Sequence, residues 1–221
     1  MPVHPAKKIG LGLAALGALT SPMLGTNPAA PVSTSVSGMA MMANGCGLDG
    51  SEAHGTDHAA ENELKNRFSF PMTSDYNTEI TLQKLLEANN EDSFDTTKAG
   101  IIEGVITEVK AGGVESCNCH SQDAAFMDTH IYISVNSTDL KKQSVIVEIT
   151  PRIRSQMKAK GTDWTTPALR SQIKGKHVRV SGWLFYDKEH ENAAENILKR
   201  PNNWRATCWE IHPVTDIKLL P

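Results

Sequence analysis

The sequence lacks a hydrophobic run long enough to cross a membrane as a stable helix. Its apolar N-terminal run, residues 9–20 (IGLGLAALGALT), is shorter than the roughly 20 residues that the hydrocarbon core of a bilayer requires. Lys7 and Lys8 precede the run and small residues follow it, which is the pattern of a secretory signal peptide. We therefore expect residues 1–30 to be a signal peptide and the protein to be exported to the periplasm or the extracellular space. The ambiguous cleavage site leaves an uncleaved, membrane-tethering helix as the alternative.

A strongly basic composition is also absent. The formal net charge is −3 at pH 7, whereas non-specific binding of nucleic acid depends on clustered lysines and arginines. The charge is unevenly distributed, because acids dominate residues 31–94 and a slight basic excess follows in residues 95–221. Net charge therefore gives no support to nucleic-acid binding, although it does not exclude a local basic groove.

The common signatures of hydrolases and nucleotide-binding proteins are missing. The chain contains no GxSxG, no glycine-rich phosphate loop and no HExxH, so a serine-hydrolase elbow, a P-loop and the usual zinc-protease helix are not indicated. Any chemistry must come from side chains that the fold brings together.

Cysteines are few. In an exported protein, the four cysteines, Cys46, Cys117, Cys119 and Cys208, occupy a compartment where disulfides persist, and three full pairings are open. We predict a disulfide from Cys117 or Cys119 to Cys208, which would join the end of the first strand to the last. A metal site of Cys117, Cys119 and His120 is the alternative, but Cys-x-Cys-His is not the spacing of a zinc knuckle.

The segment before the predicted barrel divides into two parts. Residues 31–77 are rich in small, polar and acidic residues without a helical or alternating apolar period, so we expect a disordered acidic linker. Residues 78–99 begin with TEITLQKLLEANN, whose spaced apolar residues and capping threonines predict one short helix packed on the following domain.

Strand-like alternation begins at residue 100. Runs rich in β-branched residues predict five strands, at residues 101–110, 128–135, 144–150, 175–187 and 206–219. A helical segment containing Ile153 and Leu169 separates the third strand from the fourth. This order is that of an OB-type Greek-key barrel. We therefore predict a mainly β protein in which residues 100–221 form an OB-like barrel, preceded by the signal peptide and the linker.

Several strings in this region carry a family resemblance. The strings GGVESCNC, DTHIYI, VIVEITPR, GWLFYDKEHENAAEN and NWRATCWEIHPVT resemble those of a family of uncharacterised exported bacterial proteins with an OB-fold-like domain. The resemblance covers most of residues 81–219. It implies the barrel and export, and it implies no particular activity.

Polar residues that can bind metal or move protons interrupt the predicted strands and the loop after the fourth strand. Three histidines and three acids make up this set: His130, His190, His212, Asp128, Asp187 and Glu210. Imidazoles with carboxylates suit a divalent metal such as zinc, with further acids orienting the rings. We predict the three histidines as metal ligands and the three acids as catalytic or orienting groups. The alternatives are that each histidine hydrogen-bonds a loop carbonyl or a neighbouring acid, or that the residues form a polar binding site without metal.

Two functional hypotheses follow. The first is an exported OB-fold module that holds an unidentified polymeric or small ligand without turnover, with an oligonucleotide or oligosaccharide as the example that the fold suggests. The alternative is a metal-dependent hydrolase, a phosphodiesterase or nuclease, in which the metal lowers the pKa of a bound water. In either case we expect residues 187–196 and 207–213 to form one site, with the rings of His190 and His212 within about 8 Å or sharing a carboxylate.

Overall fold

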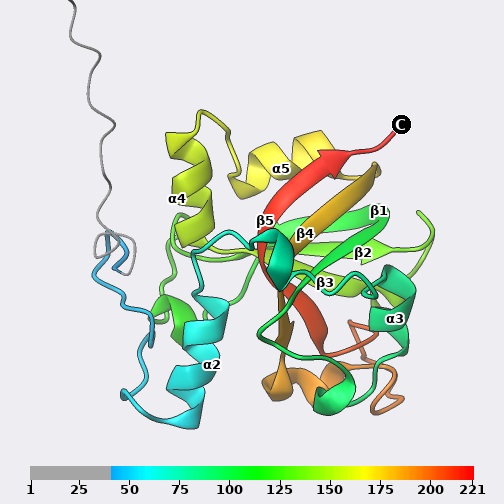
Figure 1. Cartoon of the computed structure of the whole chain (residues 1–221), viewed down its shortest axis with the longest axis horizontal. Coiled ribbons are helices and arrows are strands. Elements are labelled where there is room, and N and C mark those ends of the chain that lie inside the picture. The colour runs from blue at the N-terminus through cyan, green and yellow to red at the C-terminus, as the bar shows by residue number, and fades with distance from the viewer. Residues whose placement is uncertain (1–40) are drawn as a thin grey trace, which may run out of the picture. The chain divides into compact units, whose positions relative to one another are not determined.

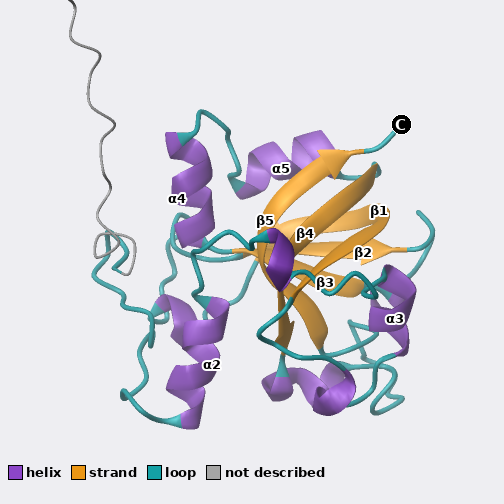
Figure 2. Cartoon of the chain, viewed as in Figure 1, coloured by secondary structure: helices purple, strands orange, loops and turns teal. Residues whose placement is uncertain are grey.

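The fold is built around a closed five-stranded barrel, seen in a computed structural model that describes residues 41–221. The predicted signal peptide and residues 31–40 of the predicted linker lie outside the described residues. The strands are β1 (Ala99–Ala111), β2 (Thr129–Ser134), β3 (Val145–Ile149), β4 (His177–Tyr186) and β5 (Trp209–Leu219). They close in the order β1-β2-β3-β5-β4, and the helices surround them (Figures 1 and 2). The prediction of a mainly β chain with a five-stranded barrel is confirmed.

All neighbouring strands pair antiparallel except β3 and β5, which run parallel. Ile131 and Ile133 of β2 belong to the hydrophobic core. Because side chains alternate along a strand, His130 and Tyr132 project to the opposite, outer face. That outer face is also buried, so a second layer of the molecule covers it.

Short helices fill the connections that the sequence predicted to be helical. Helix α3 (Leu82–Glu87) begins at Thr81, whose hydroxyl accepts the backbone N–H of Lys84, and it confirms the predicted helix in residues 78–99. Between β3 and β4 lie α4 (Pro151–Ala159) and α5 (Thr166–Ile173). They add Ile153 and Leu169 to the core.

The prediction of a disordered linker is wrong for residues 41–77. This segment contains α2 (Asp57–Lys65), capped by Thr56, and packs on the barrel through polar contacts. The Asn66 side chain donates to the backbone oxygens of Leu48 and Cys117, and Arg67 donates to backbone oxygens of β4 and β5. Packing through hydrogen bonds to backbone oxygens does not require apolar residues at regular spacing. The sequence of this segment therefore gave no sign that it packs on the barrel.

The disulfide pairing also differs from the prediction. Cys46 is bonded to Cys119, with their Cα atoms 5.8 Å apart, whereas Cys117 and Cys208 are buried free thiols. The predicted bridge to Cys208 is wrong because Cys208 packs into the barrel core, while Cys119 lies in the β1–β2 loop that contacts residues 41–66. Among the described residues, no helix has the length and apolar content of a membrane span.

Candidate metal centre

The strand register collects charged residues on the outer face of β2, β3 and β5. His130 of β2 stands opposite Glu148 of β3. In the parallel β3–β5 pair, Ile146 is level with Glu210, so two residues further along each strand Glu148 comes level with His212. Alternation then places His130, Glu148 and His212 on the same face.

Glu148 lies between the two histidines. Its Oε2 atom is 3.1 Å from Nε2 of His130 and 3.8 Å from Nδ1 of His212. On the other side of the His212 ring, Nε2 is 3.8 Å from Oδ2 of Asp128. The structure thus brings together three of the predicted site residues, Asp128, His130 and His212, around a glutamate that was not predicted.

The loop between β1 and β2 closes one edge of the cluster. Oε1 of Glu115 is 3.5 Å from Nε2 of His130, and Oε2 of Glu115 accepts a 3.2 Å hydrogen bond from Lys65 at the end of α2. The thiol of Cys117 lies 3.6 Å from Oε2 of Glu115 and 3.8 Å from Oδ2 of Asp128, and it can donate its single proton to either oxygen. A Cβ at Gly112 would lie 2.7 Å from Nε2 of His130, so this close approach of loop and ring requires glycine.

An ion-pair chain continues from His212 into the loop after β4. Nδ1 of His212 is 3.2 Å from Oε2 of Glu210, and the fully buried Arg205 donates to the other oxygen of Glu210. Arg205 also donates to Oδ2 of Asp187 at 2.5 Å, and the same oxygen lies 2.7 Å from Nδ1 of His190. Each member of the chain fixes the orientation of the next.

The structure has this series of ion pairs in place of the predicted cluster of three histidines. His190 and His212 use different carboxylates, those of Asp187 and Glu210, which Arg205 joins. In the part of the chain that the structure describes, His190 belongs to none of the groups of His, Cys and acidic side chains whose ligand atoms all lie within 4.8 Å. His190 therefore lies at the far end of this series of ion pairs, away from the candidate ligands.

Negative charge exceeds permanent positive charge in this cluster. Its members are five carboxylates and two cations: Glu115, Asp128, Glu148, Asp187 and Glu210, with Lys65 and Arg205. Charges removed from water are costly unless they are compensated. The charge balance therefore favours additional positive charge inside the cluster, which either protonated His130 and His212 or a bound cation can supply.

Burial and the neighbouring charges shift the pKa values of the ionisable groups in the cluster. Burial alone would lower the pKa of His130, but the charge of Glu148 and the contact with Glu115 outweigh burial and raise it to about 10. Burial raises the pKa of the Asp128 carboxyl to about 6, although the charge of His212 acts in the opposite sense. Burial would also raise the pKa of Glu115, but His130 and Lys65 hold it well below its usual range. Such perturbed groups concentrate at functional sites.

The donor atoms also fit a metal ion. Three groups of three in this cluster have ligand atoms that lie within 4.8 Å of one another: Glu115–His130–Glu148, Asp128–Glu148–His212 and Glu115–Cys117–Asp128. Within the described residues, Nδ1 of His130 and Oδ1 of Asp128 are buried without a hydrogen-bond partner, and Nε2 of His212 makes no hydrogen bond and lies 3.8 Å from Oδ2 of Asp128. Buried polar atoms are nearly always paired, so unpaired ones that converge indicate a site for a ligand.

Four residues of the cluster, Lys65, Glu115, Glu148 and Arg205, were missed by sequence reasoning. Only Glu148 carried a local signal, as the single charge in the apolar strand VIVEI. Comparisons with protein-family models, curated proteins and solved structures found nothing that matches this chain.

Proposed function

We propose that the cluster is a metal centre that activates water for hydrolysis. The observation that carries the proposal is the position of Glu148, which is common to the two three-residue ligand groups that contain a histidine. Nitrogen and carboxylate donors suit zinc and neighbouring divalent metals. A centre with three protein ligands retains positions for water, as catalytic zinc sites do. Glu148 is thus the shared ligand of a centre that holds one or two ions.

The remaining residues of the cluster act as positioning residues. Glu210 accepts from Nδ1 of His212, which leaves Nε2 free for the metal, the usual arrangement of a carboxylate, a histidine and zinc. Arg205 fixes Glu210, and Asp187 fixes Arg205. The predicted catalytic acids Glu210 and Asp187 therefore orient other groups, whereas Asp128 lies among the candidate ligands.

A phosphodiester is the substrate class that we propose. A metal lowers the pKa of a bound water toward neutrality and stabilises charge on phosphoryl oxygens. The water oxygen forms the new bond to phosphorus, the ester P–O bond breaks, and the leaving oxygen keeps the electron pair and takes up a proton. Among the ligands, the Glu115 side chain is 19% exposed and that of His130 10%, against 5% or less for Asp128, Glu148 and His212. Substrate would therefore reach the centre along the Glu115 edge.

Metal content is the decisive measurement. Untagged protein is dialysed, analysed for metals and titrated with Zn²⁺ and Mn²⁺, and hydrolysis of bis(4-nitrophenyl) phosphate is measured with and without chelator. We expect at least one tightly bound ion per chain, and activity that chelator removes and metal restores. Glu148→Gln keeps the shape of the side chain and should weaken metal binding about 100-fold or more, because losing even an outer partner of a ligand costs 10- to 100-fold. Glu103→Gln, at an exposed position of β1, is the matched control.

A second pair of variants separates metal binding from folding. Gly112→Ala places a methyl group 2.7 Å from Nε2 of His130, whereas Gly113→Ala meets nothing closer than 3.9 Å. We expect Gly112→Ala to weaken metal binding while the far-ultraviolet circular dichroism stays that of the parent, and Gly113→Ala to leave both unchanged. Absence of stoichiometric metal from the parent, together with hydrolysis that chelator does not affect, would overturn the proposal.

We also propose that the barrel is of the OB type and that it binds a polymer. The strand order, the parallel β3–β5 pair and the helices between β3 and β4 support this assignment. OB barrels bind oligonucleotides or oligosaccharides on the face of the second and third strands and in the adjoining loops; here that face is buried, so a polymer would bind along the adjoining loops. Binding without hydrolysis is therefore the second candidate function. Titrations with single-stranded DNA and with glycans test it, and failure of every polymer to bind would reject it.

Export is proposed on the N-terminal sequence pattern and on the Cys46–Cys119 disulfide, because disulfides persist mainly in oxidising compartments. Cell fractionation of the expressed full-length chain tests this. Recovery of the protein from the cytoplasm with its N-terminus intact would reject export.

A further inference from the structure

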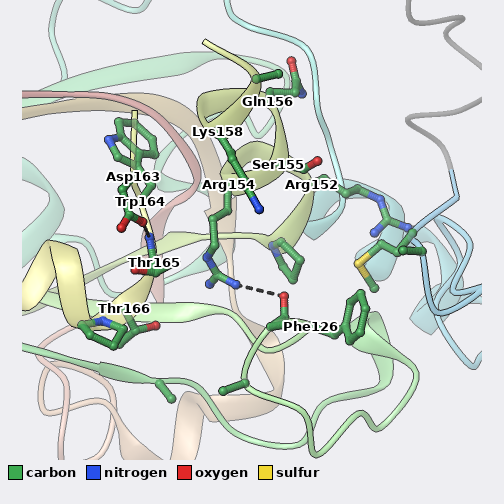
Figure 3. Close-up of a pocket in the computed structure, with 18 of the residues that line it drawn as sticks. Phe126, Arg152, Arg154, Ser155, Gln156, Lys158, Asp163, Trp164, Thr165 and Thr166 are labelled. Carbon is green, nitrogen blue, oxygen red and sulfur yellow. Dashed lines mark hydrogen bonds between the residues drawn. The ribbon is translucent and has the colours of Figure 1, made fainter. Parts of the chain in front are cut away.

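A cavity of about 970 Å³ lies between α4, α5 and the loop that precedes β2. Apolar side chains make up much of its lining, among them Met42, Phe126, Pro151 and Trp164. Four cationic side chains also line it, Arg152, Arg154, Lys158 and Arg170, against the single acid Asp163. Figure 3 shows Arg154 and Lys158 reaching from α4 into the cavity, with Phe126 on the opposite wall. The cavity therefore combines an apolar surface with an excess of positive charge.

Nearby acids offset only part of the positive charge, since Asp128 and Asp163 act on Arg154 without contacting it. Within the described residues, Arg154, Lys158 and Arg170 form no ion pair with a carboxylate. Arg154 is held rigidly, because its guanidinium donates to the backbone oxygens of Ala125 and Met127 and to the hydroxyl of Thr129. Its buried Nε atom has no hydrogen-bond partner in this part of the chain. A fixed, desolvated guanidinium in an apolar wall is a strong attractor for an anion.

We infer that this cavity binds a phosphate ester whose remaining part is apolar or aromatic. Arginine matches phosphate oxygens better than other cations do, and the volume is that of a site for a small molecule. Spacing supports the assignment, since Arg154 and Lys158 lie four residues apart on one face of α4 and Arg170 projects from α5.

The cavity adjoins the candidate metal centre through the start of β2. Arg154 donates to Thr129, and the neighbouring residue Asp128 belongs to the cluster. Glu115 and the other candidate ligands do not line the cavity, so the phosphate ester bound there is a ligand distinct from the substrate that enters along the Glu115 edge. The affinity of the cavity for a phosphate ester does not require the metal and can be measured without it.

Isothermal titration of the chelator-treated chain tests the inference with three probes: 1-naphthyl phosphate, 1-naphthol and inorganic phosphate. We expect 1-naphthyl phosphate to bind at least about ten-fold more tightly than either part alone, with an affinity that falls as salt rises. Lys158→Ala and Arg170→Ala should each weaken its binding about ten-fold, because each removes a charged hydrogen-bond donor.

Lys160→Ala is the matched control. Lys160 follows the same helix, but its ammonium lies over the ring of Phe70 and not in the cavity, so its removal should leave binding unchanged. The inference is overturned if 1-naphthyl phosphate shows no saturable binding, if 1-naphthol or inorganic phosphate binds equally well, or if Lys160→Ala weakens binding as much as Lys158→Ala. Tight metal binding without binding of the ester would reject the inference about the cavity and leave the metal centre standing. Binding of the ester without metal binding would reject the metal centre and leave the inference about the cavity standing.

Discussion

Replacing Arg205 with methionine should destabilise the fold strongly, because this residue is the central cation of the ion-pair chain. Its side chain is fully buried and pairs with two buried carboxylates, those of Asp187 and Glu210. Methionine fills a similar volume but leaves both acids without a cation. Removing one partner of a buried ion pair typically costs about 3–5 kcal/mol.

That loss translates into a large change in Tm. For a folded unit of this size, 1 kcal/mol corresponds to roughly 2–4 °C, so we expect Arg205→Met to unfold about 6–20 °C below the parent. Differential scanning calorimetry at neutral pH measures the difference. The matched control is the Arg179–Glu103 pair, whose nitrogen and oxygen are 2.6 Å apart but whose side chains are 47% and 44% exposed. Arg179→Met should change stability by less than about 1 kcal/mol, because water already solvates both charges.

A third variant identifies the cause of the loss. In the Arg205→Met protein, the additional change Asp187→Asn removes one uncompensated buried charge, so it should restore part of the lost Tm. The prediction is refuted if Arg205→Met unfolds within about 2 °C of the parent, or if its Tm falls no further than that of Arg179→Met. In either case the buried ion pairs of Arg205 do not stabilise the fold.

Two further predictions concern the cysteines and pH. The Cys46–Cys119 bridge spans 73 residues, so Cys46→Ser should lower stability by up to about 4 kcal/mol through loop-closure entropy. Mild reductant should leave the Tm of that variant unchanged. An undiminished Tm in Cys46→Ser would contradict this prediction. Hydrogen bonding to Asp187 raises the pKa of His190 above its ordinary value. The contribution of protonated His190 to the stability of the fold should therefore be complete below about pH 6.5 and decline as pH rises through the raised pKa. The difference in Tm between the parent and His190→Gln, measured from about pH 5 to pH 9, should shrink toward high pH, and a difference that grows would refute the assignment.

The barrel was predictable from the sequence because its strands either alternate or are short runs of β-branched residues. Val145–Ile149 and His177–Tyr186 are framed by polar residues and turns, and each lies within two residues of its predicted bounds. Helix α3 was predictable because Thr81 caps a short apolar face. The packing of residues 41–70 was not predictable, since polar side chains such as Asn66 and Arg67 hold it through contacts with distant backbone oxygens.

The candidate site was predictable only in part, because alternation gives the face of a residue but not its neighbour across the sheet. His130 and His212 could be assigned to polar faces of β2 and β5. Their common neighbour Glu148 follows only from the strand order, which places β3 between those two strands. Arg205 lies in an irregular loop, where periodicity carries no information about burial.

The start of β2 explains how one short segment can serve both the cluster and the cavity. Side chains alternate, so Asp128 and His130 face the buried carboxylates while Thr129 faces α4, where its hydroxyl accepts from Arg154. The charge of Asp128 acts on Arg154, since it raises the pKa of that guanidinium against the larger lowering by burial. An anion in the cavity would compete with the charge of Asp128 for Arg154, and a cation in the cluster would compensate the charge of Asp128. The two ligands would therefore favour each other's binding through this single pair of adjacent residues, with no movement of the barrel required.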